Sequence, residues 1–202
     1  MQGTKRFFSV QRMTLIAILA AIAIVLYMPP LQIPIVLFYK LDFSNIPVLL
    51  GTFAMGPLTG SIILLLKSSI GILFSSSLGV GELADFLMGL AMVLPAGLIY
   101  RRHKSRKNAI LGMAVGSVSA TIAGVLLNAF LLIPFYAAVF NMPVDSIIAM
   151  GQGVVSSIDS VWKLVLIITA PFNVLKWSAI SIVGGLIYKP LSPVLHGRKI
   201  HH

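Results

Sequence analysis

The feature that most constrains this chain is a series of long apolar segments separated by proline, glycine and short polar stretches. A helix needs about 20 mainly apolar residues to cross a bilayer, and in lipid it must satisfy its backbone hydrogen bonds internally. The 202 residues are 58% hydrophobic and 10% charged, far from the average composition of soluble domains. We therefore predict an all-α integral membrane protein with six transmembrane helices.

Proline and glycine set the expected helix boundaries. A proline-rich loop, 29–42, follows the first apolar run; the fifth run stops near Pro134, and Pro171 suits the first position of a helix. Segment 134–170 is too long for a turn, so we expect one or two short helices in it that cap one end of the bundle. The alternative is a sixth helix that begins near Asp159 and continues through Pro171. The expected helices cover residues 12–28, 44–55, 58–74, 82–100, 109–133 and 171–188.

Basic and acidic residues are segregated along the chain, and this segregation predicts the orientation. With the N-terminus in the cytoplasm, six crossings place eleven of the fifteen Lys and Arg residues inside, as the positive-inside rule requires. The same topology places all five acidic residues at the outer side. The net charge of +10 thus reflects topology and not nucleic-acid binding. We expect a cytoplasmic N-terminus at 1–11, a single membrane domain at 12–190 and a cytoplasmic tail at 191–202 that is in part an expression tag.

Polar side chains from several segments share one depth, the outer third of the predicted bundle. Buried polar groups need partners and in membranes commonly mark a substrate pocket. Asn173 and Lys176 are the strongest candidates, because they lie one turn apart on one helix face. We therefore expect an outward-facing ligand pocket capped by loops. Its candidate ligand-binding residues are Asp42, Asn45, Glu82, Asp85, Asn128, Asn173 and Lys176.

Each candidate also has a purely structural interpretation. The three carboxylates can stabilise helix N-termini, Asn128 can form an interhelical hydrogen bond, and Lys176 can extend toward the membrane interface. Lys67, in "LLLKSSI", is expected to pair with Glu82 or Asp85 and not to contact ligand.

Small residues recur at four-residue spacing on two predicted helices, a pattern that permits close approach of another helix. In segment 109–133 the pattern favours packing inside the protein. In segment 12–28, Ala17 and Ala21 form a small-residue face that can receive a neighbouring helix or a separate subunit. The residues of segment 109–133 are Gly112, Gly116, Ala120 and Gly124, with Asn128 next on the same face.

The sequence lacks the motifs of several catalytic classes. It has no cysteine, which excludes thiol catalysis and thiolate metal sites. It has neither the G-x-x-x-x-G-K-[ST] phosphate loop nor H-E-x-x-H, and His103 and His196 lie in or after basic segments. We expect no enzyme activity, no cofactor and no metal.

The segments "LDFSNIPVLLGTFAMGPLTG", "GELADFLMGL" and "PFNVLKW", with Ala17 and Ala21 on the first helix, resemble the membrane-embedded S component of energy-coupling factor (ECF) vitamin transporters. "PFNVLK" together with "GELADF" resembles the riboflavin-specific type. The resemblance covers roughly residues 10–190. One departure is Trp177, where the family pattern predicts a small residue.

The resemblance implies a high-affinity vitamin-binding subunit in the bacterial cell membrane, without catalysis of its own. It implies a transmembrane coupling (T) subunit and two cytoplasmic ABC-type ATPases as partners, with Ala17 and Ala21 facing the coupling subunit. For riboflavin, asparagine amides and Lys176 would meet the polar edge of the ring system. Asn141 joins the expected contacts to the ribityl hydroxyls. Aromatic candidates beside the rings are Tyr39, Phe43, Trp162 and Phe172.

Three alternatives remain open from the sequence. The chain could be an S component for another vitamin, such as pantothenate or folate. It could be a stand-alone ion-coupled carrier in which Glu82 or Asp85 is the proton site. It could also be a structural or regulatory membrane subunit that binds no small molecule.

Overall fold

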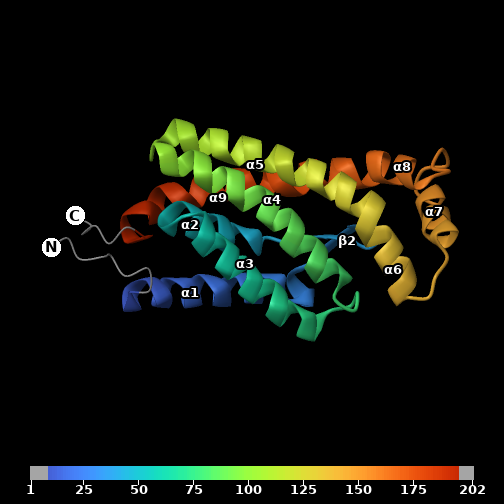
Figure 1. Cartoon of the computed structure of the whole chain (residues 1–202), viewed down its shortest axis with the longest axis horizontal. Helices are drawn as coiled ribbons and strands as arrows, with labels where there is room; N and C mark the ends of the chain where they lie inside the picture. The colour runs from blue at the N-terminus through green and yellow to red at the C-terminus, as the bar shows by residue number, and fades with distance from the viewer. Residues whose placement is uncertain (1–8, 196–202) are drawn as a thin grey trace.

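The computed structural model describes residues 9–195, with side chains described as far as residue 188. Most of this part is helical, and Figure 1 shows its helices bundled along one common direction. The helices are α1 (Val10–Tyr27), α2 (Asn45–Met55), α3 (Pro57–Gly71), α4 (Val80–Arg102), α5 (Arg106–Leu127), α6 (Ile133–Val139), α7 (Val144–Gln152), α8 (Val161–Leu164) and α9 (Ala170–Leu195). Short 3₁₀ turns, η1 (Pro29–Leu31) and η2 (Ile72–Phe74), follow α1 and α3.

Five helical segments of the described residues are long and apolar enough to cross a membrane. They are Val10–Tyr27, Pro57–Phe74, Val80–Arg102, Arg106–Val139 and Val161–Tyr188. Helix α2 is apolar but has only 11 residues. The long apolar helices expected of a membrane protein are thus present among the described residues. The expected terminal segments 1–11 and 191–202 lie largely outside the described residues.

Two expected helix ends were wrong, and both errors have the same physical cause. The fifth helical segment does not stop near Pro134 but continues to Val139, and the last begins at Val161 and runs through Pro171. A π turn precedes each proline: η3 (Asn128–Leu132) and η4 (Val165–Thr169). Because these turns already shift the backbone hydrogen bonds to i→i−5, each helix continues past a residue that lacks an N–H.

The long last helix confirms the alternative boundary near Asp159 rather than a start at Pro171. The connection before it therefore shortens to residues 140–160, which contain α7 as the expected short helix. Ile147 and Gly151 of α7 are buried. In Figure 1 this helix lies at one end of the bundle, beside α6 and α8.

The loop expected at 29–42 contains a short antiparallel hairpin, which corrects the all-α expectation in this detail. Strands β1 (Ile33–Val36) and β2 (Tyr39–Leu41) pair with Ile33 opposite Leu41. The turn holds Leu37 at a φ of 50°, in the left-handed region. The strands are too short to show an alternating pattern in the sequence.

Small residues of α5 pack inside the bundle, as predicted. A Cβ built on Gly112 would lie 2.7 Å from the backbone oxygen of Ala96 in α4, and one on Gly124 would meet the Asn173 side chain at 2.8 Å. The closest approach of these helices therefore requires glycine. By contrast, Ala17 and Ala21 are exposed on α1, while Ala20 and Ala23 are buried.

Candidate functional site

A cavity of about 140 Å³ lies where the hairpin meets α4, the π turn η3 and α9. This volume far exceeds the roughly 10–15 Å³ that a single water requires. Its walls include five candidates from the sequence: Asp42, Glu82, Asp85, Asn128 and Lys176. The candidates Phe43, Asn45, Asn141 and Asn173 are not among its lining residues.

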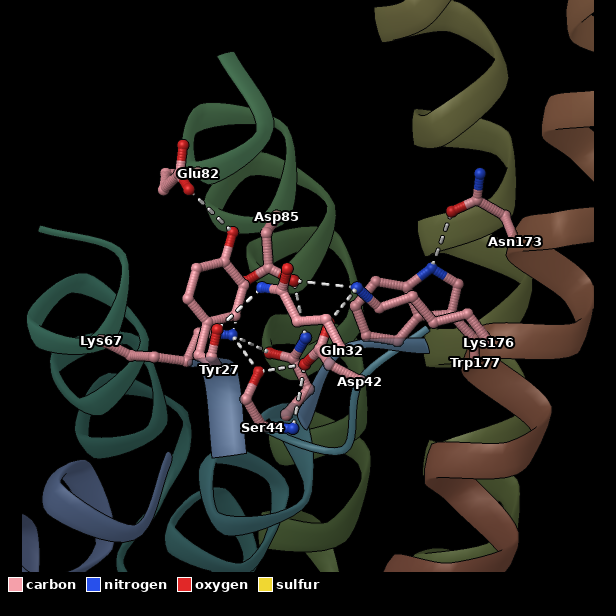
Figure 2. Close-up of polar contacts among 11 residues, drawn as sticks. Tyr27, Gln32, Asp42, Ser44, Lys67, Glu82, Asp85, Asn173, Lys176 and Trp177 are labelled. Carbon is pink, nitrogen blue, oxygen red and sulfur yellow. Dashed lines mark hydrogen bonds and ion pairs between the residues drawn. The ribbon is translucent and has the colours of Figure 1, made fainter. Parts of the chain in front are cut away.

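A network of buried charges includes three residues of the cavity wall, Asp42, Asp85 and Lys176, together with Lys67 behind them (Figure 2). The Nζ of Lys67 lies 2.5 Å from the Oδ2 of Asp85, and the Nζ of Lys176 lies 3.1 Å from both Asp85 Oδ1 and Asp42 Oδ2. All four side chains are almost entirely buried. Two ammonium groups thus balance two carboxylates, which is how charges persist in a low-dielectric interior.

The two lysines differ in how many of their donors the protein uses. An ammonium has three N–H donors. Lys67 uses all three, on Ser44, Asn45 and Asp85, and it does not line the cavity. Lys67 was expected to pair with Glu82 or Asp85, and the structure shows that its partner is Asp85. Among the described residues, Lys176 donates to two carboxylates, and it does line the cavity, so its third N–H is available to a ligand.

Ser44 and Asn45, at the start of α2, hold this network together. The Asn45 amide donates to Asp85 at 2.8 Å and accepts from Lys67 at 3.0 Å. The Ser44 backbone N–H and hydroxyl both donate to Asp42. Asn45 therefore lies behind the cavity wall, where it fixes the charged groups that form it.

Glu82 occupies a separate part of the wall, with hydroxyl partners only. It accepts hydrogen bonds from Ser75 at 2.6 Å, Ser77 at 3.3 Å and Tyr27 at 3.4 Å. Among the described residues, no Lys or Arg forms an ion pair with it. The serine-rich loop before α4 thus supplies the donors that this buried carboxylate requires.

The hydroxyl of Tyr39 connects the hairpin to both π turns. It donates to Asn128 Oδ1 at 3.0 Å and lies 2.6 Å from Thr169 Oγ1. Asn128 Nδ2 donates to the carbonyl oxygen of Gly124 at 2.7 Å. Since a carbonyl can only accept, this contact fixes the orientation of the Asn128 amide. Burial raises the pKa of the Tyr39 phenol above its ordinary value, so the hydroxyl keeps its proton at neutral pH.

Asn173 and Trp177 form a pair beside the cavity. The Asn173 amide donates to the Thr169 carbonyl at 2.9 Å and accepts from Trp177 Nε1 at 3.1 Å. Trp177 is only 1% exposed and belongs to the main core cluster. The unexpected tryptophan thus fills the interior and orients Asn173, whose contact with ligand remains a prediction.

The aromatic side of the cavity comes mainly from the hairpin and α6. Phe38 and Tyr136 stack with ring centroids 5.2 Å apart, and Tyr39 packs on Phe172 at 5.0 Å. All four line the cavity. Of the other aromatic candidates, Trp162 is half exposed and Phe43 packs against a core cluster.

Sequence reasoning missed Tyr27, Gln32, Phe38, Tyr136 and the serines of the loop before α4 as wall residues. The hairpin residues carry no helical period, and Tyr136 lies beyond the proline at which the fifth helix was expected to end. Asn141, a predicted contact, is exposed after α6 with a φ of 49°.

The chemistry available in this cavity is recognition rather than catalysis. Its walls combine six aromatic side chains, one spare ammonium N–H, a hydroxyl-bonded carboxylate and an oriented amide. The described residues contain no cluster of three His, Cys, Asp or Glu side chains that could hold a metal. Such a cavity suits a flat ligand that also carries hydrogen-bonding groups.

Comparison with known proteins gives consistent matches over nearly the whole chain. A family model for the substrate-specific component of ECF transporters matches residues 11–188. The riboflavin transporter RibU of Staphylococcus aureus (strain TCH60) is 36% identical over 186 residues, which cover 92% of each chain. The riboflavin transporter FmnP of Bacillus subtilis (strain 168) is 27% identical, over 96% of this chain and 98% of its own.

A solved structure of the S component of a bacterial ECF transporter has the same fold. It superposes with a TM-score of 0.71 at 34% sequence identity. The match covers 92% of this chain and 98% of that one.

Proposed function

This chain belongs to the family of substrate-specific components of ECF transporters, and we propose that it binds riboflavin for import. Its similarity to several riboflavin transporters supports this ligand. The family and these relatives are transport proteins, so the chain is a transport subunit and not an enzyme. It is a membrane protein.

The observation that carries the proposed ligand site is the position of Lys176. Its Nζ is held by Asp42 and Asp85 with one N–H remaining, in the wall of a cavity whose side is aromatic. A flavin ring system has a flat apolar body and an edge of carbonyl oxygens. The ammonium would donate to that edge, while Phe38, Tyr39 and their stacked partners contact the rings.

The remaining polar groups suit the other parts of riboflavin. Asn128, with its amide fixed by Tyr39 and Gly124, would contact the ring edge. Glu82 and Asp42 would accept from ribityl hydroxyls, since a carboxylate only accepts. Asn45 and Asn173 are proposed to act as positioning residues, because their amides are occupied by protein partners.

We propose that the subunit works with a transmembrane coupling subunit and two cytoplasmic ABC-type ATPases. The exposed Ala17 and Ala21 on α1 support a docking face there, because small residues permit close helix approach. We further propose that α2 completes six crossings and that the cavity faces outward, with both termini in the cytoplasm. The distribution of basic residues supports this orientation.

The proposal is tested by the absorption spectrum of the full chain purified in detergent from riboflavin-containing cells. We expect flavin absorbance in the visible range and an equimolar amount of riboflavin after denaturation. A colourless protein that also fails to take up added riboflavin would contradict the proposed ligand.

A further inference from the structure

A second cavity, of about 530 Å³, lies at the end of the bundle opposite the hairpin. It is formed by the start of α1, the turn between α2 and α3, and the end of α4 with the connection that follows. Figure 1 shows the start of α1 and the α4–α5 connection at the end away from α7. Nothing in the proposed riboflavin site uses this cavity.

The charge of this second cavity has one sign. Its lining includes Arg12, Arg101 and Lys104, and none of its described lining residues is acidic. Arg12 donates to the Met55 carbonyl and to Thr59 Oγ1, which fixes it against the α2–α3 turn. Arg101 and Lys104 are exposed at the mouth, where they can bind an anion that approaches from the membrane surface.

The start of α3 adds to the positive potential. Gly56, Pro57 and Leu58 line the cavity, and they form the N-terminal end of a 15-residue helix. The N-terminal end of a helix carries a partial positive charge. The C-terminal ends of α2 and α4 also line the cavity and carry a partial negative charge. The three full positive charges of Arg12, Arg101 and Lys104 outweigh it, so the cavity as a whole favours an anion.

The depth of the cavity matches that of a lipid headgroup. Arg101 follows Glu82 by 19 residues on the same helix, a rise of about 28 Å. Since the hydrocarbon core is about 30 Å thick, Arg101 and Lys104 lie at the interface opposite the riboflavin site. Exposed leucines continue into the membrane on the same helices: Leu58 and Leu65 on α3, and Leu94 and Leu98 on α4.

We propose that this second cavity binds the phosphodiester headgroup of an anionic phospholipid from the cytoplasmic leaflet. Arg101 and Lys104 contact the phosphate, Arg12 and the start of α3 form the positive floor, and the exposed leucines contact the acyl chains. Basic pockets between helices at the cytoplasmic side are a known form of acidic-lipid site. The adjoining apolar surface favours a lipid over free phosphate, which would need no such surface.

The test measures retained lipid by native mass spectrometry of the full chain, after exchange with phosphatidylglycerol or phosphatidylcholine. The test variant is Arg101→Gln/Lys104→Gln. The matched control is Arg102→Gln/Lys107→Gln, which removes the same charge from residues outside the cavity lining. We expect the test variant to lose roughly tenfold or more in phosphatidylglycerol affinity, while the control stays within about twofold of wild type.

Three results would overturn the lipid site. The first is an equal loss of phosphatidylglycerol affinity in both double variants, which would mean that general surface charge, and not this cavity, holds the lipid. The second is that the protein retains phosphatidylcholine as strongly as phosphatidylglycerol, or that millimolar inorganic phosphate displaces the lipid completely. The third is a test variant that keeps wild-type lipid affinity but no longer binds the purified coupling subunit, which would make the cavity a site for that subunit. Riboflavin titration of each variant verifies folding, because the two cavities share no residue.

Discussion

Lys67 and Asp85 form an ion pair with 2.5 Å between Nζ and Oδ2, and side chains that are 0% and 5% exposed. Asp85 also pairs with Lys176, so one carboxylate joins the structural lysine to the one that faces the cavity. This relationship ties the stability of the fold to the geometry of the proposed ligand site.

Asp85→Asn is expected to lower the free energy of unfolding by about 3–5 kcal/mol, because it leaves two buried ammonium groups with too little negative charge. Lys67→Met should lower the free energy of unfolding by less, since Asp85 keeps Lys176 as a partner. Thermal unfolding in detergent measures both. The control is Asp159→Asn, which breaks the exposed pair with Lys163 and should change stability by less than about 1 kcal/mol. Equal midpoints for Asp85→Asn and the control would contradict the network's structural role.

Tyr39→Phe is expected to weaken riboflavin binding by roughly three- to tenfold. The variant keeps the ring against Phe172 but removes the donor that orients Asn128 and the contact to Thr169. Fluorescence titration gives the affinity. Tyr136→Phe is the matched control, because Tyr136 lines the same cavity and stacks on Phe38 through its ring. If both variants bind equally well, the hydroxyl of Tyr39 does not position the site.

Leucine at positions 17 and 21 is expected to abolish assembly with the coupling subunit and the ATPases. The added side chains would keep the partner helix from the small-residue face of α1. Riboflavin binding should be unchanged, because neither residue lines the cavity. Co-purification of the assembled complex is the measurement, with Ile22→Leu as a volume-conserving control on the same helix. Normal assembly of the Ala17→Leu/Ala21→Leu variant would remove this face from the proposed interface.

The apolar segments predicted the helices that are long and apolar enough to cross a membrane, because bilayer thickness sets the length that such a helix needs. Shared depth also predicted that Asp42, Asp85 and Lys176 would lie around one pocket, and the structure shows that they also pair with one another. Depth alone could not decide whether Lys67 pairs with Glu82 or Asp85, since both acids lie on the first turns of α4. That choice depends on helix rotation, which three-dimensional packing sets.

Other features could not be predicted, for reasons that lie in local geometry. By local rules, Pro134 indicates the end of a helix and Pro171 the start of one. The π turns that precede these prolines let both helices continue through them. The hairpin that brings Phe38 and Tyr39 to the cavity is too short to give an alternating pattern. Trp177 departs from the family pattern, and its role depends on a contact with Asn173 that only the three-dimensional structure shows.

The remaining N–H of Lys176 is proposed to bind riboflavin, and titration of riboflavin fluorescence tests this contact most directly. We expect saturable quenching by the wild-type protein and an affinity roughly thirtyfold weaker for Lys176→Met, as for loss of a hydrogen bond to a charged group. Lys163→Met, at an exposed lysine paired with Asp159, should bind within about twofold of wild type. The unfolding midpoint of each variant verifies that the protein is folded. A folded Lys176→Met protein with wild-type affinity would contradict a contact between Lys176 and riboflavin.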